Sequence, residues 1–237
     1  MLEEIVPIQH ERHGQKKIKP IERYDFAKSI NVASVLINEF FQAAAIYPIV
    51  FIEDQENDMF KPVVLLGIKE NENLFVDSEG KWKASYVPAI LQRYPFALAT
   101  TDEENKYTIC VDEKSELLND EEGEDLFTSE GEPGEVLERV KQKLSELQQM
   151  EEITKQFCKE MQEKNLFTPF NISLRDQEGV RNLTGSYVIN EQRLQNVSDN
   201  FFLELRRRNI LPAIYAHLVS LNQMERLSKL STEVTHQ

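Results

Sequence analysis

The chain of 237 residues is poor in cysteine, and this scarcity argues against a disulfide-stabilised fold. Its two cysteines, Cys110 and Cys158, do not have Cys-x-x-Cys spacing, and we interpret both as buried free thiols rather than as a disulfide pair. A chain of this length can bury most of the surface that its unfolded form exposes, so folding requires neither a disulfide nor a metal.

Long apolar runs are also missing from the sequence. The longest, at residues 43–52 and 62–68, fall short of the roughly 20 residues that a membrane-spanning helix needs. Glu3 and Glu4 stand where a secretory leader would carry basic residues, and no apolar segment of leader length follows them. We therefore expect no membrane insertion and no secretory leader, and the two free thiols favour a cytoplasmic location.

Basic residues are outnumbered by acidic ones. The chain has 27 Lys and Arg against 41 Asp and Glu, and its formal net charge is −14. This balance argues against binding to a nucleic-acid backbone, and we expect no nucleic-acid partner. Most of the excess lies in residues 102–138, which hold 15 acidic residues and two lysines. We call these residues the acidic segment, and we expect it to select partners by charge, with residues 119–125 as a solvated loop.

The common catalytic and metal-binding motifs do not occur. The sequence contains no phosphate-binding loop, no Gly-x-Gly-x-x-Gly turn, no Gly-x-Ser-x-Gly elbow and no His-Glu-x-x-His helix. The stretch His10-Glu11-Arg12-His13 resembles a metal-binding cluster but lacks an obvious third ligand. We therefore predict no metal site and no cofactor.

Helical and extended patterns alternate along the chain. Three times a helical pattern is followed by a proline and then by two extended runs, and the prolines are Pro48, Pro95 and Pro169. Proline lacks an amide hydrogen and disfavours a helical residue before it, so it ends a helix and starts an extended segment. The predicted helices are residues 32–46, 87–93, 134–165, 200–209 and 213–227, and the predicted strands are 49–52, 62–68, 96–100, 107–111, 171–174 and 183–189.

This order predicts an α+β fold in which antiparallel β hairpins pack against segregated helices. We expect a single domain, residues 1–237, with three diverged helix–hairpin repeats at 32–80, 87–131 and 151–191 and a helical C-terminal part at 198–228. Ancient duplication and coincidence among common turn residues both account for the repeated order, and the sequence leaves the two explanations open.

The titratable residues allow a catalytic hypothesis and a structural one. In the catalytic hypothesis, His217 meets carboxylates in a cleft and works with them as an acid–base pair. The candidate carboxylates are Glu39, Asp112, Glu113 and Glu191. In the structural hypothesis, which we favour, His217 is a hydrogen-bonded packing residue on an apolar helix and Glu39 faces solvent.

The densest group of unusual residues lies at positions 80–96 and includes the only tryptophan. Large aromatic rings with a polar tip, grouped near turns, either form a binding shelf for a peptide or clamp loops onto the core, and clamping is the more common role. The candidate ligand-binding residues are Trp82, Tyr86, Arg93 and Tyr94.

Over roughly residues 5–228 the chain resembles the SapC family of bacterial proteins. The matching stretches include Tyr47-Pro48, residues 73–75, Gly80-Lys81-Trp82, residues 86–89, Arg93-Tyr94-Pro95-Phe96, residues 185–191 and residues 214–218. The chain departs from the family at Gln92, where a second basic residue is expected beside Arg93, and in the acidic segment.

The resemblance implies association with a bacterial surface layer, from the family's name, and a link to nutrient uptake, from the proteins encoded beside its members. It implies no particular reaction. The sequence and the resemblance together predict a non-catalytic accessory or interaction protein that binds a protein or peptide partner. An enzyme that uses carboxylates with His217 is the alternative.

Overall fold

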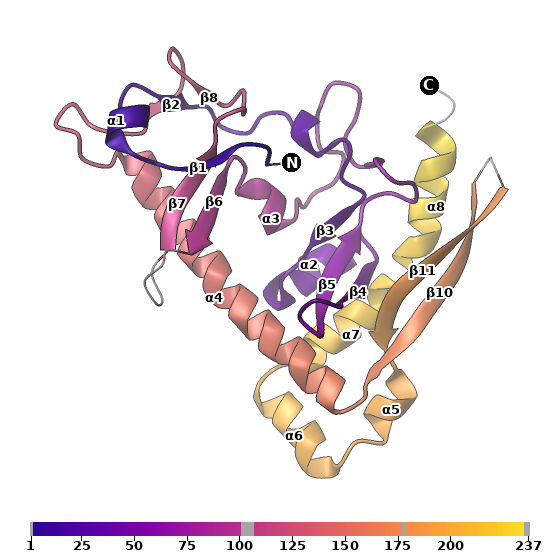
Figure 1. Ribbon diagram of the computed structural model, residues 1–237. Helices are drawn as coiled ribbons and strands as arrows, with labels where there is room; N and C mark the ends of the chain where they lie inside the picture. The colour runs from indigo at the N-terminus through magenta and orange to yellow at the C-terminus, as the bar shows by residue number, and fades with distance from the viewer. Residues whose placement is uncertain (1, 101–106, 177–178, 235–237) are drawn as a thin grey trace.

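Two antiparallel sheets lie along one long helix, α4 (Glu135–Glu163), which crosses the molecule diagonally in Figure 1. The computed structural model describes residues 2–100, 107–176 and 179–234. Antiparallel strands and helices occupy separate parts of the fold, so the predicted α+β class is confirmed.

The larger sheet has the strand order β10-β11-β4-β5-β3. Its centre is the hairpin of β4 (Ile49–Asp54) and β5 (Met59–Leu65), with β3 (Val32–Ser34) on one edge. A second hairpin, β10 (Phe167–Asp176) and β11 (Gly179–Ile189), joins the other side through β11 and β4.

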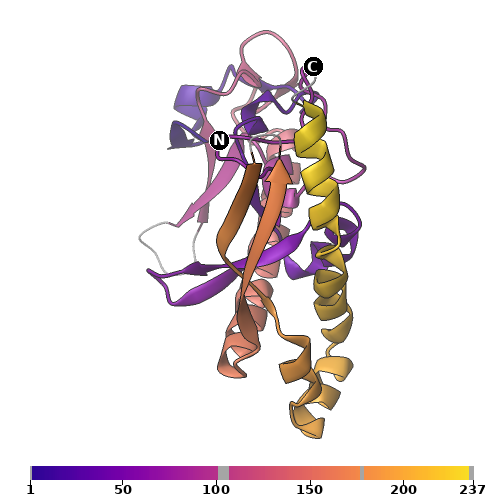
Figure 2. The ribbon, with the colours of Figure 1, turned by 90° about the vertical axis from the view of Figure 1, so that its right-hand side faces the viewer.

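Helices cover this larger sheet. The helices α2 (Phe40–Ala44) and α7 (Leu211–Ser220) pack against each other, and α7 contacts β4 and β11. Figure 2 shows α7 and α8 (Gln223–Val234) as a column beside the β10–β11 hairpin, with α5 (Glu191–Gln195) and α6 (Asp199–Arg207) at its lower end. None of the helices in the described ranges is both long and apolar enough to cross a bilayer.

The smaller sheet has the order β1-β7-β6 and packs against the N-terminal half of α4. Its strands are β1 (Ile5–Pro7), β6 (Phe96–Thr100) and β7 (Tyr107–Asp112), and β6 follows the short helix α3 (Ala89–Gln92) and a cis peptide bond between Tyr94 and Pro95. The helix α1 (His10–His13) follows β1, and a third sheet, of order β8-β2-β9, consists of β2 (Lys17–Ile18), β8 (Leu118–Asn119) and β9 (Glu124–Asp125).

Two hydrophobic cores share α4. Phe157 and Met161, near its C-terminal end, belong to the core of the larger sheet, whereas Val136 and Leu144 belong to the core of the smaller sheet. Both pairs of residues belong to the one apolar stripe that the sequence predicts along the helix. The middle of α4, between Leu144 and Thr154, therefore spans the junction of the two cores.

The predicted helix at residues 32–46 is wrong in its first part. Val32–Ser34 forms β3, Ile37–Glu39 forms a 3-10 turn, and only α2 is α-helical. Val32 lies opposite Leu65, and the amide of Val35 donates to the carbonyl of Pro62 at 3.1 Å. Pairing with a strand some 30 residues away in the sequence outweighed the local helical spacing, which is favoured only weakly at β-branched residues.

The predicted helix at 213–227 is also wrong in one respect, because it consists of two helices. A turn at Leu221 and Asn222 separates α7 from α8. The Asn222 side chain donates to the carbonyl of Val219 at 3.0 Å, and this carbonyl also accepts from the backbone amide of Asn222 at 3.2 Å. The predicted strand at 96–100 and the long helix that follows Gly134 are confirmed.

The prediction of a solvated loop at residues 119–125 is confirmed for residues 120–123, an exposed bend, and wrong at the two ends of the stretch, which are strands. β8 and β9, at the two ends of this stretch, pair with β2 on either side. Lysines near β2 pair with the acidic residues: the ammonium–carboxylate distances are 2.9 Å for Lys16–Asp120, 3.6 Å for Lys17–Asp125 and 2.6 Å for Lys19–Glu122. Part of the acidic segment's charge is therefore compensated within the chain. Positions 102–106 of that segment lie outside the described residues.

The order of a helix followed by an antiparallel hairpin occurs three times, at α2-β4-β5, α3-β6-β7 and α4-β10-β11. The first two units are each followed by a turn of the same construction, in which Gly80 and Gly131 have φ angles of 81° and 85°. The two turns share three backbone hydrogen bonds. In the first turn they run from Asp77 N to Lys81 O, from Gly80 N to Asp77 O and from Lys83 N to Phe75 O. In the second turn the corresponding bonds run from Thr128 N to Glu132 O, from Gly131 N to Thr128 O and from Gly134 N to Leu126 O. The shared turn supports duplication of these two units, and a common origin of all three stays a prediction.

Candidate binding site

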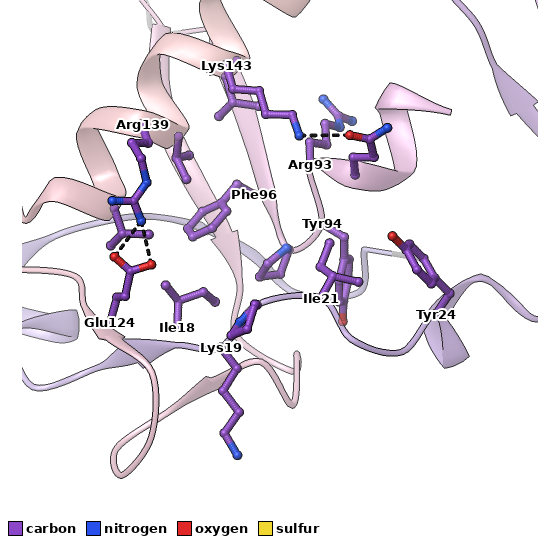
Figure 3. Close-up of a pocket in the computed structure, with 16 residues that line it drawn as sticks. Ile18, Lys19, Ile21, Tyr24, Arg93, Tyr94, Phe96, Glu124, Arg139 and Lys143 are labelled. Carbon is purple, nitrogen blue, oxygen red and sulfur yellow. Dashed lines mark hydrogen bonds and ion pairs between the residues drawn. The ribbon is translucent and has the colours of Figure 1, made fainter. Parts of the chain in front are cut away.

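A cavity of about 360 Å³ lies between the N-terminal half of α4, residues 92–96 and the N-terminal segment 18–24 (Figure 3). We call it the cationic pocket. This volume is within the range of pockets that hold small ligands. Its apolar lining consists of Ile18, Pro20, Ile21, Pro95, Phe96, Val136, Val140 and Leu144.

The four-residue spacing on α4 produces one wall of the cationic pocket. Val136, Val140 and Leu144 recur every four residues and line the cavity. Arg139 and Lys143, also four residues apart, stand beside this apolar row at the edge of the pocket. The wall therefore combines an apolar surface with positive charge.

Two of the four cations at this pocket are already paired. An Nη of Arg139 donates to both carboxylate oxygens of Glu124, each at 2.6 Å. The Lys19 side chain points away from the cavity, as Figure 3 shows, and pairs with Glu122. The charges left to the cavity are those of Arg93 and Lys143.

Lys143 has an amide partner in place of a carboxylate. Its ammonium donates to Oε1 of Gln92 at 3.3 Å, and the Gln92 side-chain nitrogen donates to the carbonyl of Val87 at 2.6 Å. Partial desolvation lowers the pKa of Lys143. Within the described part of the chain no acidic side chain pairs with its ammonium, so a ligand anion can interact with it.

Arg93 carries an unsatisfied donor. Its Nε is buried and has no hydrogen-bond partner among the residues that the structure describes. Burial lowers the pKa of Arg93, and the charge of Glu151 opposes this effect. A buried donor without an acceptor costs roughly 1–3 kcal/mol, so Arg93 would gain from an acceptor that a ligand brings.

Tyr94 forms part of the wall beside Arg93. Its ring stacks on Phe26, with 4.0 Å between the ring centroids and 14° between the planes. Burial raises the pKa of the Tyr94 phenol, which stays neutral at physiological pH. Two of the four predicted ligand-binding residues, Arg93 and Tyr94, therefore line the cationic pocket.

The other two, Trp82 and Tyr86, lie in a hydrogen-bonded cluster and do not line this cavity. The indole nitrogen of Trp82 donates to the Tyr47 hydroxyl at 2.9 Å and to the Tyr86 carbonyl at 3.0 Å. Tyr47 also donates to that carbonyl, and its ring packs against Phe75 in the core. These contacts are those of a clamp that holds residues 82–86 on the core, and they leave a binding role of the two side chains untested.

Glu39 is buried and its carboxylate is saturated. Oε1 accepts from the amide of Ala89 at 2.8 Å and from the Tyr86 hydroxyl, and Oε2 accepts from the amide of Leu36 at 2.8 Å. Its exposed fraction is 4%, so the expectation that Glu39 faces solvent is wrong. Glu39 thus joins the start of α2 to α3. The pKa of Tyr86 is raised chiefly by burial, and the hydrogen bond to Glu39 raises it further.

His217 is fully buried, and both of its ring nitrogens are bound to backbone. Nδ1 donates to the carbonyl of Ile49 at 2.9 Å, and Nε2 accepts from the amide of Ile189 at 3.1 Å. These partners fix a neutral imidazole, and burial lowers its pKa to about 4. His217 thus links α7 to β4 and to the end of β11, as the structural hypothesis expects.

The remaining candidate carboxylates occupy other places. Asp112 accepts from the amides of Glu3 and Glu4 at 2.9 and 3.0 Å, while Glu113 binds Arg12 and His13, and Arg12 is the main cause of its lowered pKa. Glu191 is exposed in the first turn of α5.

No contact in the described ranges joins any of the candidate carboxylates to His217. Likewise, those ranges contain no group of three or more His, Cys, Asp and Glu side chains that could hold a metal ion.

Lys143 and Arg139 were not among the predicted site residues. The signal for them was present, because basic residues four apart flanked the predicted apolar stripe of α4. The opposite wall could not have been found in this way, since it comes from residues 18–24, more than 100 residues away.

The comparison with family models gives a match to SapC over residues 8–227. The match covers almost the whole chain, and the protein belongs to the SapC family. No curated protein and no solved structure matches it.

Proposed function

We propose that this SapC family member is a non-catalytic binding protein that holds an anionic segment of a peptide or protein partner in the cationic pocket. The observation that carries the proposal is the pair of cations, Arg93 and Lys143, which lie on an apolar floor and have no acidic hydrogen-bond partner among the residues that the structure describes. The chain as a whole has a net charge of −14, so it is the local positive charge of the cationic pocket that attracts a negatively charged ligand. By the family's name, its role would be accessory to a bacterial surface or nutrient-uptake system.

The length of the lined surface favours a peptide over a small metabolite. The residues of α4 that line the cationic pocket and the adjoining cavity run from Val136 to Lys155. At 1.5 Å per residue this distance is roughly 28 Å, which an extended peptide of about eight residues would match.

A binding role also agrees with the state of the potential catalytic groups. The imidazole of His217 and the carboxylate of Glu39 are both buried and hydrogen-bonded to backbone amides or carbonyls. A general acid or base must reach a substrate atom at hydrogen-bond distance, and these groups are committed to the fold.

Fluorescence anisotropy with two labelled peptides of about eight residues tests the proposal. One peptide alternates Glu and Leu, and the other alternates Lys and Leu. We expect the acidic peptide to bind, the basic peptide not to bind, and Lys143→Gln to weaken the acidic peptide at least threefold. Lys141→Gln is the matched control, because it removes the same charge from the same helix but lies at a different cavity. Equal binding of the two peptides, or equal effects of the two variants, would contradict the proposal.

A further inference from the structure

A second cavity, of about 250 Å³, continues along α4 from the cationic pocket. We call it the junction cavity, because it lies under the middle of α4, where the two hydrophobic cores meet. Arg93 and Leu144 line both cavities and therefore stand between them. Its apolar lining consists of Val35, Leu36, Phe60, Pro62, Ile90, Leu98, Leu144 and Leu147.

The charged side chains at the junction cavity are compensated, apart from Arg93. Lys61 pairs with Asp54, and Lys155 pairs with Glu151 at 3.3 Å and with Glu152 at 2.8 Å.

The hydroxyl of Thr154 is satisfied as well, since it donates to the carbonyl of Met150 at 2.7 Å and accepts from the amide of Ile37 at 3.1 Å. Among the described residues that line this cavity, Arg93 is thus the one with a buried, unsatisfied side-chain atom, its Nε.

We propose that Arg93 binds the carboxylate of a ligand whose aliphatic or aromatic group fills the junction cavity. A guanidinium presents a planar donor fork that matches a carboxylate, and the apolar walls next to it favour a hydrocarbon group. One unpaired positive charge facing Glu151 suits a monoanion better than a phosphate dianion.

Two sources supply this chemistry: the C-terminal residue of a peptide, and a free carboxylic acid of similar size. The inference rests on the proposed function for the peptide source only. In that case the rest of the peptide would leave the junction cavity past Arg93 and run along the cationic pocket toward Lys143.

Isothermal titration calorimetry with two matched pairs of probes tests the inference. The first pair is octanoate and octanamide, and the second is an N-acetylated tetrapeptide ending in leucine, as the free acid and as the C-terminal amide. We expect the acid of at least one pair to bind at least about tenfold more tightly than its amide, since a hydrogen-bonded ion pair replaces a neutral contact. Arg93→Met should remove this preference, and Arg93→Gln should reduce it, which gives a second variant if the first does not fold.

Arg206→Met is the control, because it removes an exposed arginine from α6, away from both cavities. It should leave the acid preference unchanged. If only the octanoate pair shows the preference, the carboxylate site stands without its peptide source, and the proposed function is still decided by the acidic and basic peptides; if the peptide pair shows it, the C-terminal residue of a peptide is a ligand of this site. Equal binding of acid and amide in both pairs, no binding by any probe, or a preference that survives in Arg93→Met would overturn the inference.

Discussion

Replacing Arg93 with methionine should make the protein more stable. In the wild type the buried Nε of Arg93 has no acceptor among the described residues, and burial lowers the pKa of the side chain. An unsatisfied buried donor costs roughly 1–3 kcal/mol, and part of this is offset by the attraction of Glu151. Methionine has a similar length and no donor, and we expect a net gain of about 1 kcal/mol in the free energy of unfolding.

Urea unfolding and thermal melting followed by circular dichroism measure this change. A gain of about 1 kcal/mol corresponds to an increase in Tm of roughly 2–4 °C for a chain of this size. Arg206→Met, on the exposed surface of α6, should change the stability by less than about 0.5 kcal/mol.

A loss of more than about 1 kcal/mol in Arg93→Met would refute the reasoning, because Arg93 would then be an anchor of the fold. A gain in stability at the cost of ligand binding is the pattern expected of a residue kept for function.

Three further predictions concern the groups that we assign to the fold. Burial lowers the pKa of His217 to about 4, from an ordinary value of 6.5, so the unfolded chain takes up the proton first as the pH falls. The wild type should therefore lose about 3 kcal/mol of its free energy of unfolding between pH 6.5 and 4 through this group. Urea unfolding of His217→Gln at the same pH values should not show that part of the loss. Glu39→Gln replaces one carboxylate oxygen with an NH2 donor, so the amide of either Leu36 or Ala89 loses its acceptor, and the free energy of unfolding should fall by about 2 kcal/mol in the same assay; an unchanged stability would contradict the structural role of Glu39. Gly131→Ala should lower the free energy of unfolding by about 1 kcal/mol because of the positive φ at this position. Gly80→Ala should lower it further, since the new Cβ would also lie 2.5 Å from Oδ2 of Asp25, and equal losses would count against this geometry.

The elements set by local pattern were predictable. The apolar stripe of α4 and the extended run of β6 after Pro95 are encoded within short windows, and the structure has both. β3 was not predictable in this way, because its extended form depends on pairing with β5, and residues 35–44 keep a helical spacing that the chain uses only from η2 (Ile37–Glu39) onward. The pairing of β8 and β9 with β2 also joins segments about 100 residues apart, which a reading of local charge treats as a loop.

The candidate site was predictable in part for the same reason. Arg93 and Tyr94 stood out because an arginine and a tyrosine adjoin a proline in an aromatic-rich stretch, and both line the cationic pocket. Trp82 belongs to the same stretch, yet its indole bonds to Tyr47, a partner 35 residues earlier in the chain that only the fold reveals. The unsatisfied Nε of Arg93 is a property of packing between two cores, and no sequence pattern reports it.

A crystal structure of the protein grown with octanoate or with the leucine-ended peptide acid tests the central claim most directly. The account predicts a carboxylate oxygen about 3 Å from Nε of Arg93 and a hydrocarbon group in the junction cavity. A ligand bound elsewhere, with Nε of Arg93 still without an acceptor, would contradict it.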